Sequence, residues 1–263
     1  MITSTHNQHV AFCRSLHRSR PRREAKAFLV EGVRLAHEGL DAEVELELAL
    51  YDPAVLTGSD AGAELLSRLT GMDHAYEASA AAIAAAAETR TPQGVVLVAR
   101  EPDPPPPESI VDQHLLLVLD GISDAGNAGT ILRSAAAAGL GVVVFAGDTV
   151  DPWLGKVVRA GMGAHFRIGI VQATWEDLAS RIARFDQVLA AEAAADITIY
   201  DVEWSRTTAL IIGSEAHGLA PEAKALEPGR VRISMAAGME SLNAAAAAAV
   251  ILFHAAHSAA CPV

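Results

Sequence analysis

Cysteine and long apolar runs are scarce in this chain of 263 residues, and each scarcity argues against a class of protein. The two cysteines, Cys13 and Cys261, lie near opposite ends without metal-ligand spacing. This usage favours a reducing, cytoplasmic compartment, and we expect no metal site. The first twenty residues lack an apolar core, so no signal peptide is expected. The strongly apolar part of the tail, residues 250–253, is too short to span a membrane and predicts a buried helix.

Positive charge is also in short supply, because the formal net charge is −12 at pH 7. Binding to phosphates relies on Lys and Arg, so most of this surface is unsuited to nucleic acid. The basic residues, however, are concentrated at the amino end. Residues 1–40 contain seven Arg and Lys against three Glu. This basic segment is compatible with local contact to nucleic acid, and a solvated helix face is the alternative interpretation.

A run of four prolines at positions 104–107 marks the clearest boundary in the chain. Consecutive prolines cannot donate backbone hydrogen bonds and favour a stiff, extended spacer. We therefore expect a first domain at 1–100, a Pro-rich linker at 101–113 and a second domain at 114–263. In the first domain, strands at 28–30, 46–50 and 94–99 and helices at 32–39 and 78–87 predict a small α/β layer.

The second domain has a regular alternation of apolar runs and helical segments. Strands are expected at 115–119, 142–145, 166–170, 188–190, 209–212 and 231–233, and helices at 128–138 and from Trp175, with Thr174 as N-cap. Continuous apolar runs of this length indicate strands that are covered on both faces. The pattern predicts a doubly wound, mostly parallel sheet. Such sheets bind ligands beyond the carboxyl ends of their strands.

Three motifs follow these apolar runs, where a ligand site is expected. The first places Asn127 six residues before Arg133, in a stretch rich in small residues. The second is Gly-Ser-Glu, with Glu215, and the third is Ser-Leu-Asn, with Ser241 and Asn243. Each has a plainer interpretation: a turn for the glycines and a helix N-cap for Asn127, a surface position for Glu215, and a helix N-cap for Ser241. Capping by Ser241 would not explain Asn243 in the next turn.

Together, in this order, the motifs resemble the SpoU/TrmH family of RNA ribose methyltransferases over residues 114–256. Residues 158–166 are similar to a further family segment. Residues 2–7, 22–34 and 91–94 resemble the RNA substrate-binding domain that many members carry. The resemblance implies an α/β fold with a C-terminal trefoil-knotted, mostly parallel sheet. It also implies a smaller, ribosomal-protein-like α/β domain at the N-terminus.

What the resemblance implies about function is specific. The cofactor would be S-adenosylmethionine, held by Ala190, Gly213, Ile233, Met235 and Leu242, and the acceptor a ribose 2′-hydroxyl of RNA. The implied catalytic residues are Asn127, Arg133, Glu215, Ser241 and Asn243. Arg133 is the group that activates the hydroxyl in family accounts. A guanidinium is a poor general base, so electrostatic stabilisation of the developing alkoxide is an equally good role. Members work as homodimers, in which Arg133 would reach the cofactor of the other subunit.

The RNA partner is expected to contact the basic segment through Arg14, Arg22, Arg23 and Lys26. The ribosomal-protein-like first domain favours large-subunit ribosomal RNA over transfer RNA. An enzyme protecting its host from a ribosome-directed antibiotic would have the same architecture. Two other classes stay open: a non-catalytic RNA-binding or ribosome-assembly module, and a nicotinamide-dependent oxidoreductase. An oxidoreductase of that class carries a Gly-x-Gly-x-x-Gly turn after its first strand, and this chain lacks such a turn after the strand expected at 115–119.

Overall fold

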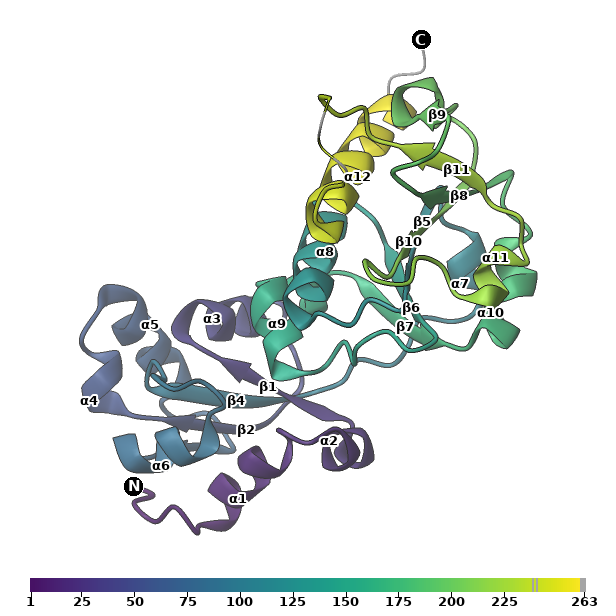
Figure 1. Ribbon diagram of the computed structural model, residues 1–263. Helices are drawn as coiled ribbons and strands as arrows, with labels where there is room; N and C mark the ends of the chain where they lie inside the picture. The colour runs from purple at the N-terminus through teal and green to yellow at the C-terminus, as the bar shows by residue number, and fades with distance from the viewer. Residues whose placement is uncertain (238, 240, 261–263) are drawn as a thin grey trace. The chain divides into compact units, whose positions relative to one another are not determined.

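The proline run at 104–107 marks the point where the chain passes from one compact unit to another. The structure is a computed structural model that describes residues 1–237, 239 and 241–260. Unit 1 comprises Met1–Asp103 and Trp153–Phe166, and unit 2 comprises Pro104–Pro152 and Arg167–Val263 (Figure 1). The segment 153–166 thus belongs to unit 1, although the expected second domain, 114–263, includes it.

Unit 1 is built on a four-stranded sheet in the order β1-β4-β2-β3. Its strands are β1 (Ala27–Glu31), β2 (Leu46–Tyr51), β3 (Ala75–Glu77) and β4 (Val95–Arg100). β4 runs antiparallel to β1 and β2, and β3 runs parallel to β2. The expected strands at 28–30, 46–50 and 94–99 are therefore confirmed. Every residue of β1 is buried, because helices cover both faces of the sheet.

One face of this sheet packs against helices α1 and α6. Its core contains Val10, Cys13, Leu29, Leu50 and Ile83, with further alanine and valine side chains. The helices of unit 1 are α1 (Gln8–Ser15), α2 (Ser19–Ala25), α3 (Val33–Asp41), α4 (Pro53–Leu56), α5 (Asp60–Leu69), α6 (Ala80–Ala86) and α9 (Gly155–Gly161), followed by a 3₁₀ turn at Ala164–Phe166. The alanine-rich run at 78–87 forms the predicted helix, with Ser79 as its N-cap.

Aromatic packing explains why the segment 153–166 joins unit 1. The ring of Phe28 on β1 lies 4.8 Å from that of Trp153 and 6.3 Å from that of Phe166, centroid to centroid. The guanidinium of Arg159 on α9 adds ion pairs to Glu31 at 3.2 Å and Glu88 at 3.0 Å. Removing residues 1–100 would therefore expose apolar rings and leave Arg159 without these carboxylates.

Unit 2 is built on a seven-stranded sheet in the order β7-β6-β5-β10-β8-β11-β9, in which every pairing is parallel. The strands are β5 (Leu115–Asp120), β6 (Val142–Ala146), β7 (Gly169–Ala173), β8 (Gln187–Ala191), β9 (Ile197–Thr198), β10 (Thr208–Gly213) and β11 (Gly229–Arg232). The predicted parallel sheet is confirmed. Parallel pairing brings the carboxyl ends of β8, β10 and β11 to one edge.

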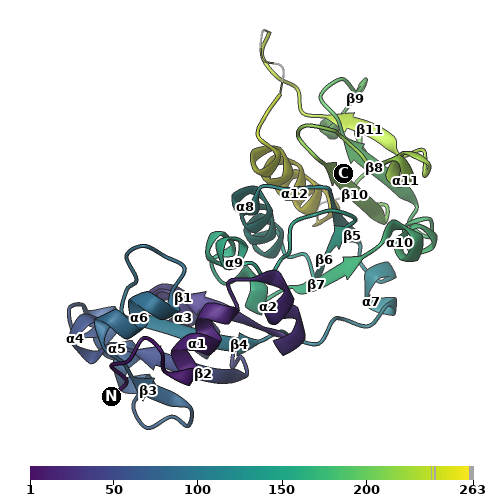
Figure 2. The same ribbon diagram turned by 60° about the horizontal axis from the view of Figure 1, so that its bottom comes forward.

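Helices cover both faces of this second sheet (Figures 1 and 2). They are α7 (Glu108–Val111), α8 (Ala125–Ala137), α10 (Trp175–Ile182), α11 (Pro221–Lys224) and α12 (Ala244–Ala260), with a 3₁₀ turn at Ile199–Asp201. α7, α10 and α11 share one core with the strands, through residues such as Ile110, Leu178 and Ala223. α8 and α12 lie side by side over the other face (Figure 2). Thr174 caps α10 as expected.

Three details differ from the sequence-based expectations. The strand expected at 166–170 starts only at Gly169, because residues 164–166 form a 3₁₀ turn in unit 1. The expected linker at 101–113 contains α7, whose Ile110 is buried in the core of unit 2. The last helix is capped by Asn243 and not by Ser241, since Asn243 Oδ1 accepts from the backbone N–H groups of Ala245 and Ala246. Within the part of the chain that the structure describes, no helix is long and apolar enough to cross a membrane.

Candidate active site

A cavity of about 410 Å³ lies at the carboxyl edge of the unit 2 sheet, where a parallel sheet binds its ligands. Three loops and the start of α12 enclose it. Its lining includes residues 191–194 at the end of β8 and beyond it, 212–215 and 218 at the end of β10 and beyond it, 231–233 and 235 around the end of β11, and 241, 242, 244, 247 and 251 before and along α12. Its volume is within the range of about 300–1,000 Å³ that is common for small-molecule sites.

Four of the five residues predicted to hold the cofactor line this cavity: Gly213, Ile233, Met235 and Leu242. Ala190 does not. Its side chain is completely buried, because it lies in the core that the sheet shares with α7, α10 and α11. The next residues, Ala191 and Glu192, line the cavity in its place. Glu192 was not expected from the sequence, although its position directly after a buried strand was a signal for it.

Gly213 is required at the base of the loop after β10. A Cβ atom on Gly213 would lie 2.8 Å from the carbonyl carbon of Gly218, and no side chain can move to relieve a contact with backbone. The loop closes on itself through hydrogen bonds in both directions between Ser214 and Gly218, of 3.0 and 2.8 Å. This tight closure projects Glu215 from the end of the strand. The glycines of the second motif thus shape the loop that carries the carboxylate.

Asn127, Glu215 and Asn243 form one hydrogen-bonded network, although they come from three separate motifs. The side-chain amide of Asn127 donates to Glu215 Oε1 at 2.7 Å, and that of Asn243 donates to Asn127 Oδ1 at 3.0 Å. Asn243 Nδ2 also lies 3.4 Å from Glu215 Oε1. Because each amide donates through nitrogen and accepts through oxygen, the network is mutually consistent. Three of the five predicted catalytic residues are therefore brought together.

The same network ties the loop after β10 to the starts of two helices. Glu215 Oε1 accepts from the backbone N–H of Ala244, at 3.1 Å, in the first residue of α12. A carboxylate in this position is favoured by the helix dipole. On α8 the N-cap is Asp124, which accepts from the backbone N–H of Asn127 at 2.8 Å. The capping role is thus taken by a neighbour, which leaves the Asn127 side chain available for the network.

The two other predicted catalytic residues lie outside the network. Ser241 is exposed and lines the cavity next to Leu242. Arg133 is exposed on α8, and it makes no hydrogen bond or ion pair to any residue that the structure describes. Its guanidinium is therefore available to an external anion.

Asp120, at the end of β5, anchors the loop after β10 by hydrogen bonds and was not predicted as a site residue from the sequence. Its carboxylate is 2% exposed and accepts from Trp175 Nε1 at 2.9 Å and from the backbone N–H of Ala220 at 2.6 Å. It is paired in register with Gly213 on β10. It therefore fixes the far end of the loop that carries Glu215. Its place at a strand end was the signal that could have found it.

The arginine cluster predicted to bind RNA divides in two. Arg14, Arg23 and Lys26 are exposed on or next to α1 and α2. Arg22 is not: its side chain is 2% exposed, and Nη1 donates to the backbone carbonyl of Leu16 at 2.7 Å. The prediction that Arg22 contacts RNA is therefore wrong, because its guanidinium is buried and hydrogen-bonded inside unit 1.

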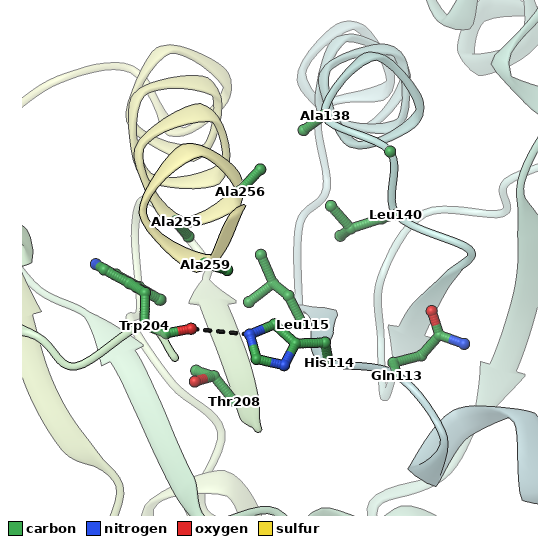
Figure 3. A pocket seen from close by; sticks show the side chains of 11 residues that line it. Gln113, His114, Leu115, Ala138, Leu140, Trp204, Thr208, Ala255, Ala256 and Ala259 are labelled. Atoms are coloured by element: carbon green, nitrogen blue, oxygen red, sulfur yellow. Dashed lines mark hydrogen bonds between the residues drawn. The ribbon is translucent and has the colours of Figure 1, made fainter. Parts of the chain in front are cut away.

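A second cavity in unit 2, of about 320 Å³, lies near the start of β5 and the end of α12 (Figure 3). Its polar groups are largely engaged. His114 Nε2 is 2.8 Å from the carbonyl oxygen of Trp204, and Gln113 donates to the carbonyl of Ser109. Alanines of α12 form much of the rest, with Ala255, Ala256 and Ala259 labelled in Figure 3. None of the predicted catalytic or cofactor residues lines it.

Residues 114–253 match the model of the SpoU rRNA Methylase family, and residues 7–97 match that of the MRM3-like substrate binding domain. The chain belongs to the SpoU rRNA methylase family. It is 30% identical over 256 residues to Bacillus subtilis 23S rRNA (guanosine(2553)-2′-O)-methyltransferase RlmP, covering 96% of this chain and 98% of that protein. Among the residues that the structure describes, no group of three or more His, Cys, Asp or Glu side chains is placed to hold a metal ion.

Two solved structures extend the similarity to the SpoU fold and its cofactor. An AdoMet-bound rRNA methyltransferase from Sinorhizobium meliloti superposes with a TM-score of 0.79 at 30% identity, over 97% of each chain. The SpoU methyltransferase AviRb from Streptomyces viridochromogenes, in complex with AdoMet, superposes with a TM-score of 0.80 at 27% identity, over 96% and 98%. The exposed residues Arg14, Arg23 and Lys26 of this family member fall within the matched substrate-binding domain.

Proposed function

We propose that the protein transfers a methyl group from S-adenosylmethionine to a ribose 2′-hydroxyl of large-subunit ribosomal RNA. The observation that carries the proposal is the meeting of Asn127, Glu215 and Asn243 beside the 410 Å³ cavity. Two further findings support it. The Bacillus subtilis relative, similar over nearly the whole chain, is named for this reaction on 23S rRNA. Two relatives of the same fold are described with AdoMet bound.

The cavity suits S-adenosylmethionine in size and in chemistry. Ile233, Met235, Leu242 and Ile251 supply apolar walls for a flat base and a methylene chain. Glu192, beyond the end of β8, supplies a carboxylate that can accept hydrogen bonds from ribose hydroxyls or from an ammonium group. When bound, S-adenosylmethionine supplies a methyl group that its sulfonium already activates. The protein therefore has to position the acceptor and stabilise the charge that develops on it.

The residues around the cavity divide this work. Glu215 and the two asparagines hold the loop after β10 against α8 and α12, so they act as positioning residues for the cofactor pocket. Ser241, exposed at its edge, can donate to or accept from the acceptor ribose. Arg133 holds a phosphate of the RNA and stabilises the 2′-oxygen as it loses its proton. A permanently charged guanidinium suits this electrostatic role better than that of a base.

Arg133 acts across a homodimer in this proposal. The support lies on α12, where Ala246, Val250, Phe253 and His257 follow one another at helical spacing, and Val250 and Phe253 are exposed. The side chain of Phe253 is 50% exposed and that of Val250 41%. An apolar stripe of this kind suits a second copy of the chain, packed helix to helix. Sedimentation of the wild type and of Phe253→Glu tests this, and a wild-type monomer contradicts it.

RNA capture falls to the substrate-binding domain. Arg14, Arg23 and Lys26 supply phosphate contacts on a protein whose net charge is otherwise strongly negative. Neutralising Arg14, Arg23 and Lys26 together lowers the log–log salt slope of RNA binding by about 0.7–0.9 for each phosphate that is no longer neutralised. An unchanged slope would mean that other residues bind the phosphates.

The experiment that tests the reaction combines transfer and mapping. Purified protein is incubated with radiolabelled S-adenosylmethionine and with either ribosomal or transfer RNA lacking modifications. Sites of 2′-O-methylation are then mapped by resistance of the adjacent bond to alkaline hydrolysis. The proposal expects label in large-subunit RNA at a protected ribose. Label on a base, or in transfer RNA alone, overturns the assignment, and cofactor binding without transfer indicates a non-catalytic RNA-binding module.

A further inference from the structure

A separate cavity of about 350 Å³ lies entirely within unit 1. Three segments form it: the junction of β1 and α3, the loop before β4, and helix α9 with the residue that follows it. Most of its lining falls within residues 7–97, which match a substrate-binding domain. The residues that matter for its chemistry are Arg34, Gln93, Thr91 and Arg159, with Leu35 and Met162 on its walls.

Of the two guanidinium groups in this cavity, one is already paired. Arg159 lies between the carboxylates of Glu31 and Glu88, at 3.2 and 3.0 Å. Glu31 in turn accepts from the backbone N–H groups of Glu88 and Thr89, at 2.9 and 3.1 Å, and from the Thr89 hydroxyl at 2.8 Å. This cluster holds the three segments together and leaves no free positive charge on Arg159. Its hydrogen bonds and ion pairs therefore fix the walls of the cavity.

Arg34 is the cation that remains. It is exposed on the first turn of α3 and makes no hydrogen bond or ion pair within the chain as far as the structure describes it. Arg159 is paired with two carboxylates, whereas Glu31, which already accepts from Arg159 and Thr89, is the carboxylate that shares the lining with Arg34. An anion that enters the cavity is therefore expected to meet Arg34.

Gln93 is oriented by the backbone of the facing segment. Its Oε1 accepts from the N–H of Val33 at 3.0 Å, and since a backbone N–H can only donate, the amide nitrogen must point the other way. A Cβ on Gly32 would lie 3.0 Å from this oxygen, and the φ of Gly32 is +97°, so only glycine fits comfortably there. The NH₂ group of Gln93 is thus held ready to donate, and no residue described in the structure accepts from it.

The remaining walls are apolar. Leu35 is 4% exposed and Val95 is fully buried, and Pro92 and Met162 complete this side. One cation, one oriented amide donor and an apolar wall are the groups that recognise an unstacked nucleotide, through its phosphate, its base edge and its base face. The volume of about 350 Å³ is at the small end of the range of about 300–1,000 Å³ for ligand sites, which suits a single nucleotide.

We propose that this cavity captures one unpaired nucleotide of the RNA substrate. In this arrangement, Arg34 binds its phosphate, Gln93 donates to an acceptor on the base edge, and Leu35, Pro92 and Met162 contact the base. The inference rests on the proposed function, because it takes RNA as the substrate. It adds a second recognition point, in the substrate-binding domain, to the methyl-transfer site in unit 2.

The test uses the full-length protein and an unmodified large-subunit rRNA transcript, with RNA affinity measured by filter binding and KM for RNA by methyl transfer. The variants are Arg34→Ala and Gln93→Glu. The second keeps an oxygen to accept from Val33 N–H but removes the amide donors. Arg184→Ala is the matched control, because it removes an exposed arginine of unit 2 that pairs with no residue described in the structure. The dissociation constant of S-adenosylhomocysteine and the thermal midpoint verify that each variant is folded.

Each of the two variants is expected to raise Kd and KM for RNA by about tenfold, the scale of one hydrogen bond to a charged group. Arg34→Ala also lowers the salt slope by about 0.7, and Gln93→Glu, which removes no cation, does not lower it in this way. The control stays within about twofold. Unchanged RNA affinity in both variants overturns the proposal, as does equal weakening by the control. If the wild type methylates the RNA and both variants have the wild-type KM for RNA, this inference alone is overturned. If the wild type transfers no methyl group, the proposed function is overturned.

Titration with a mononucleotide distinguishes a cavity that binds a nucleotide within RNA from one that binds a free small molecule. Adenosine and guanosine monophosphates are titrated against the wild type and Arg34→Ala. The proposal expects millimolar or weaker binding of either, because a nucleotide within RNA gains its affinity from the contacts of its neighbours. Micromolar binding of a monophosphate that Arg34→Ala abolishes would assign the cavity to a small-molecule ligand and overturn the proposal.

Discussion

The side-chain amide of Asn127 donates a 2.7 Å hydrogen bond to Oε1 of Glu215, which lies 88 positions later in the chain. The bond joins the first turn of α8 to the loop after β10. Asn243, at the start of α12, completes the network. Three elements that begin or end at the same sheet edge are thereby fixed to one another, and the cavity beside them takes its shape from that fixation.

Removing the charge of Glu215 should weaken this fixation. Glu215→Gln keeps an oxygen for the N–H of Ala244 but loses the charge-assisted part of the bonds from Asn127 and Asn243. We expect the Kd of S-adenosylhomocysteine to rise about tenfold, measured by isothermal titration. Glu222→Gln, an exposed carboxylate on α11, is the control and should leave the Kd unchanged. Equal affinities for all three proteins would show that the network does not shape the pocket.

Substitution of Arg133 should act on turnover and not on the cofactor. Because its guanidinium is exposed and unpaired among the residues that the structure describes, Arg133→Ala leaves the fold and S-adenosylhomocysteine binding intact. The kcat for methyl transfer should fall by more than about tenfold. Arg184→Ala is the control for the change in charge. A variant that retains more than about a tenth of the wild-type kcat would remove Arg133 from the central role.

Arg22 and Arg23 should separate stability from RNA binding, although they are neighbours. Arg22→Ala removes a buried side chain that donates to Leu16 O, so the free energy of unfolding should fall by about 2–4 kcal/mol in urea titrations. Arg23→Ala, at an exposed position, should leave stability within about 0.5 kcal/mol and weaken RNA binding. The opposite assignment of the two effects would contradict the structure.

Cys13 should be inert in the folded protein. Burial in the core of unit 1 raises the pKa of its thiol from the usual 9.0 to about 12, so almost no thiolate exists at pH 8. In a Cys261→Ser variant, which leaves Cys13 as the remaining thiol, a disulfide reagent should react only after denaturation. Rapid reaction of the native variant would show that unit 1 opens readily.

The same shift predicts a loss of stability in alkali. The pKa of the Cys13 thiol is higher in the folded protein than in the unfolded chain, so between pH 9 and about 12 the unfolded chain releases the thiol proton first. The contribution of this thiol to the free energy of unfolding is therefore complete below pH 9 and is lost as the pH rises from 9 toward 12. Unfolding free energies measured between pH 8 and pH 10.5 should therefore fall more steeply for the wild type than for Cys13→Ala. Parallel curves would contradict the shift.

Much of the fold could be predicted from local pattern. The continuous apolar runs at 115–119 and 209–212 form β5 and β10, and helices lie between the strands as the pattern predicted. Strands buried on both faces tolerate few other residues, which is why these runs are so distinct. Short or exposed elements such as β3, β9 and α11 carry no comparable pattern, and they were not expected.

The candidate site could be predicted in its residue types but not in its contacts. The glycine, asparagine and carboxylate motifs stood directly after strands, so their place at one edge followed from parallel topology. Ala190 and Arg22 show the limit. Ala190 follows the same rule as its neighbours, yet its side chain lies in the core between the sheet and α7, α10 and α11. Arg22 has the pattern of one more member of a basic cluster, yet the turn from α1 to α2 directs it inward to Leu16.

The sequence by itself determined the alternation of strands and helices, the parallel sheet and the residues that stand at its carboxyl edge, because burial and capping act over a few neighbouring positions. The tertiary structure alone decided which of those residues meet. Asn127, Glu215 and Asn243 are separated by 88 and 28 positions, and the packing of α8 against α12, beside the loop after β10, brings them within hydrogen-bond distance. The tertiary structure also assigned Trp153–Phe166 to unit 1, through contacts to Phe28 and Glu31 that no local pattern encodes.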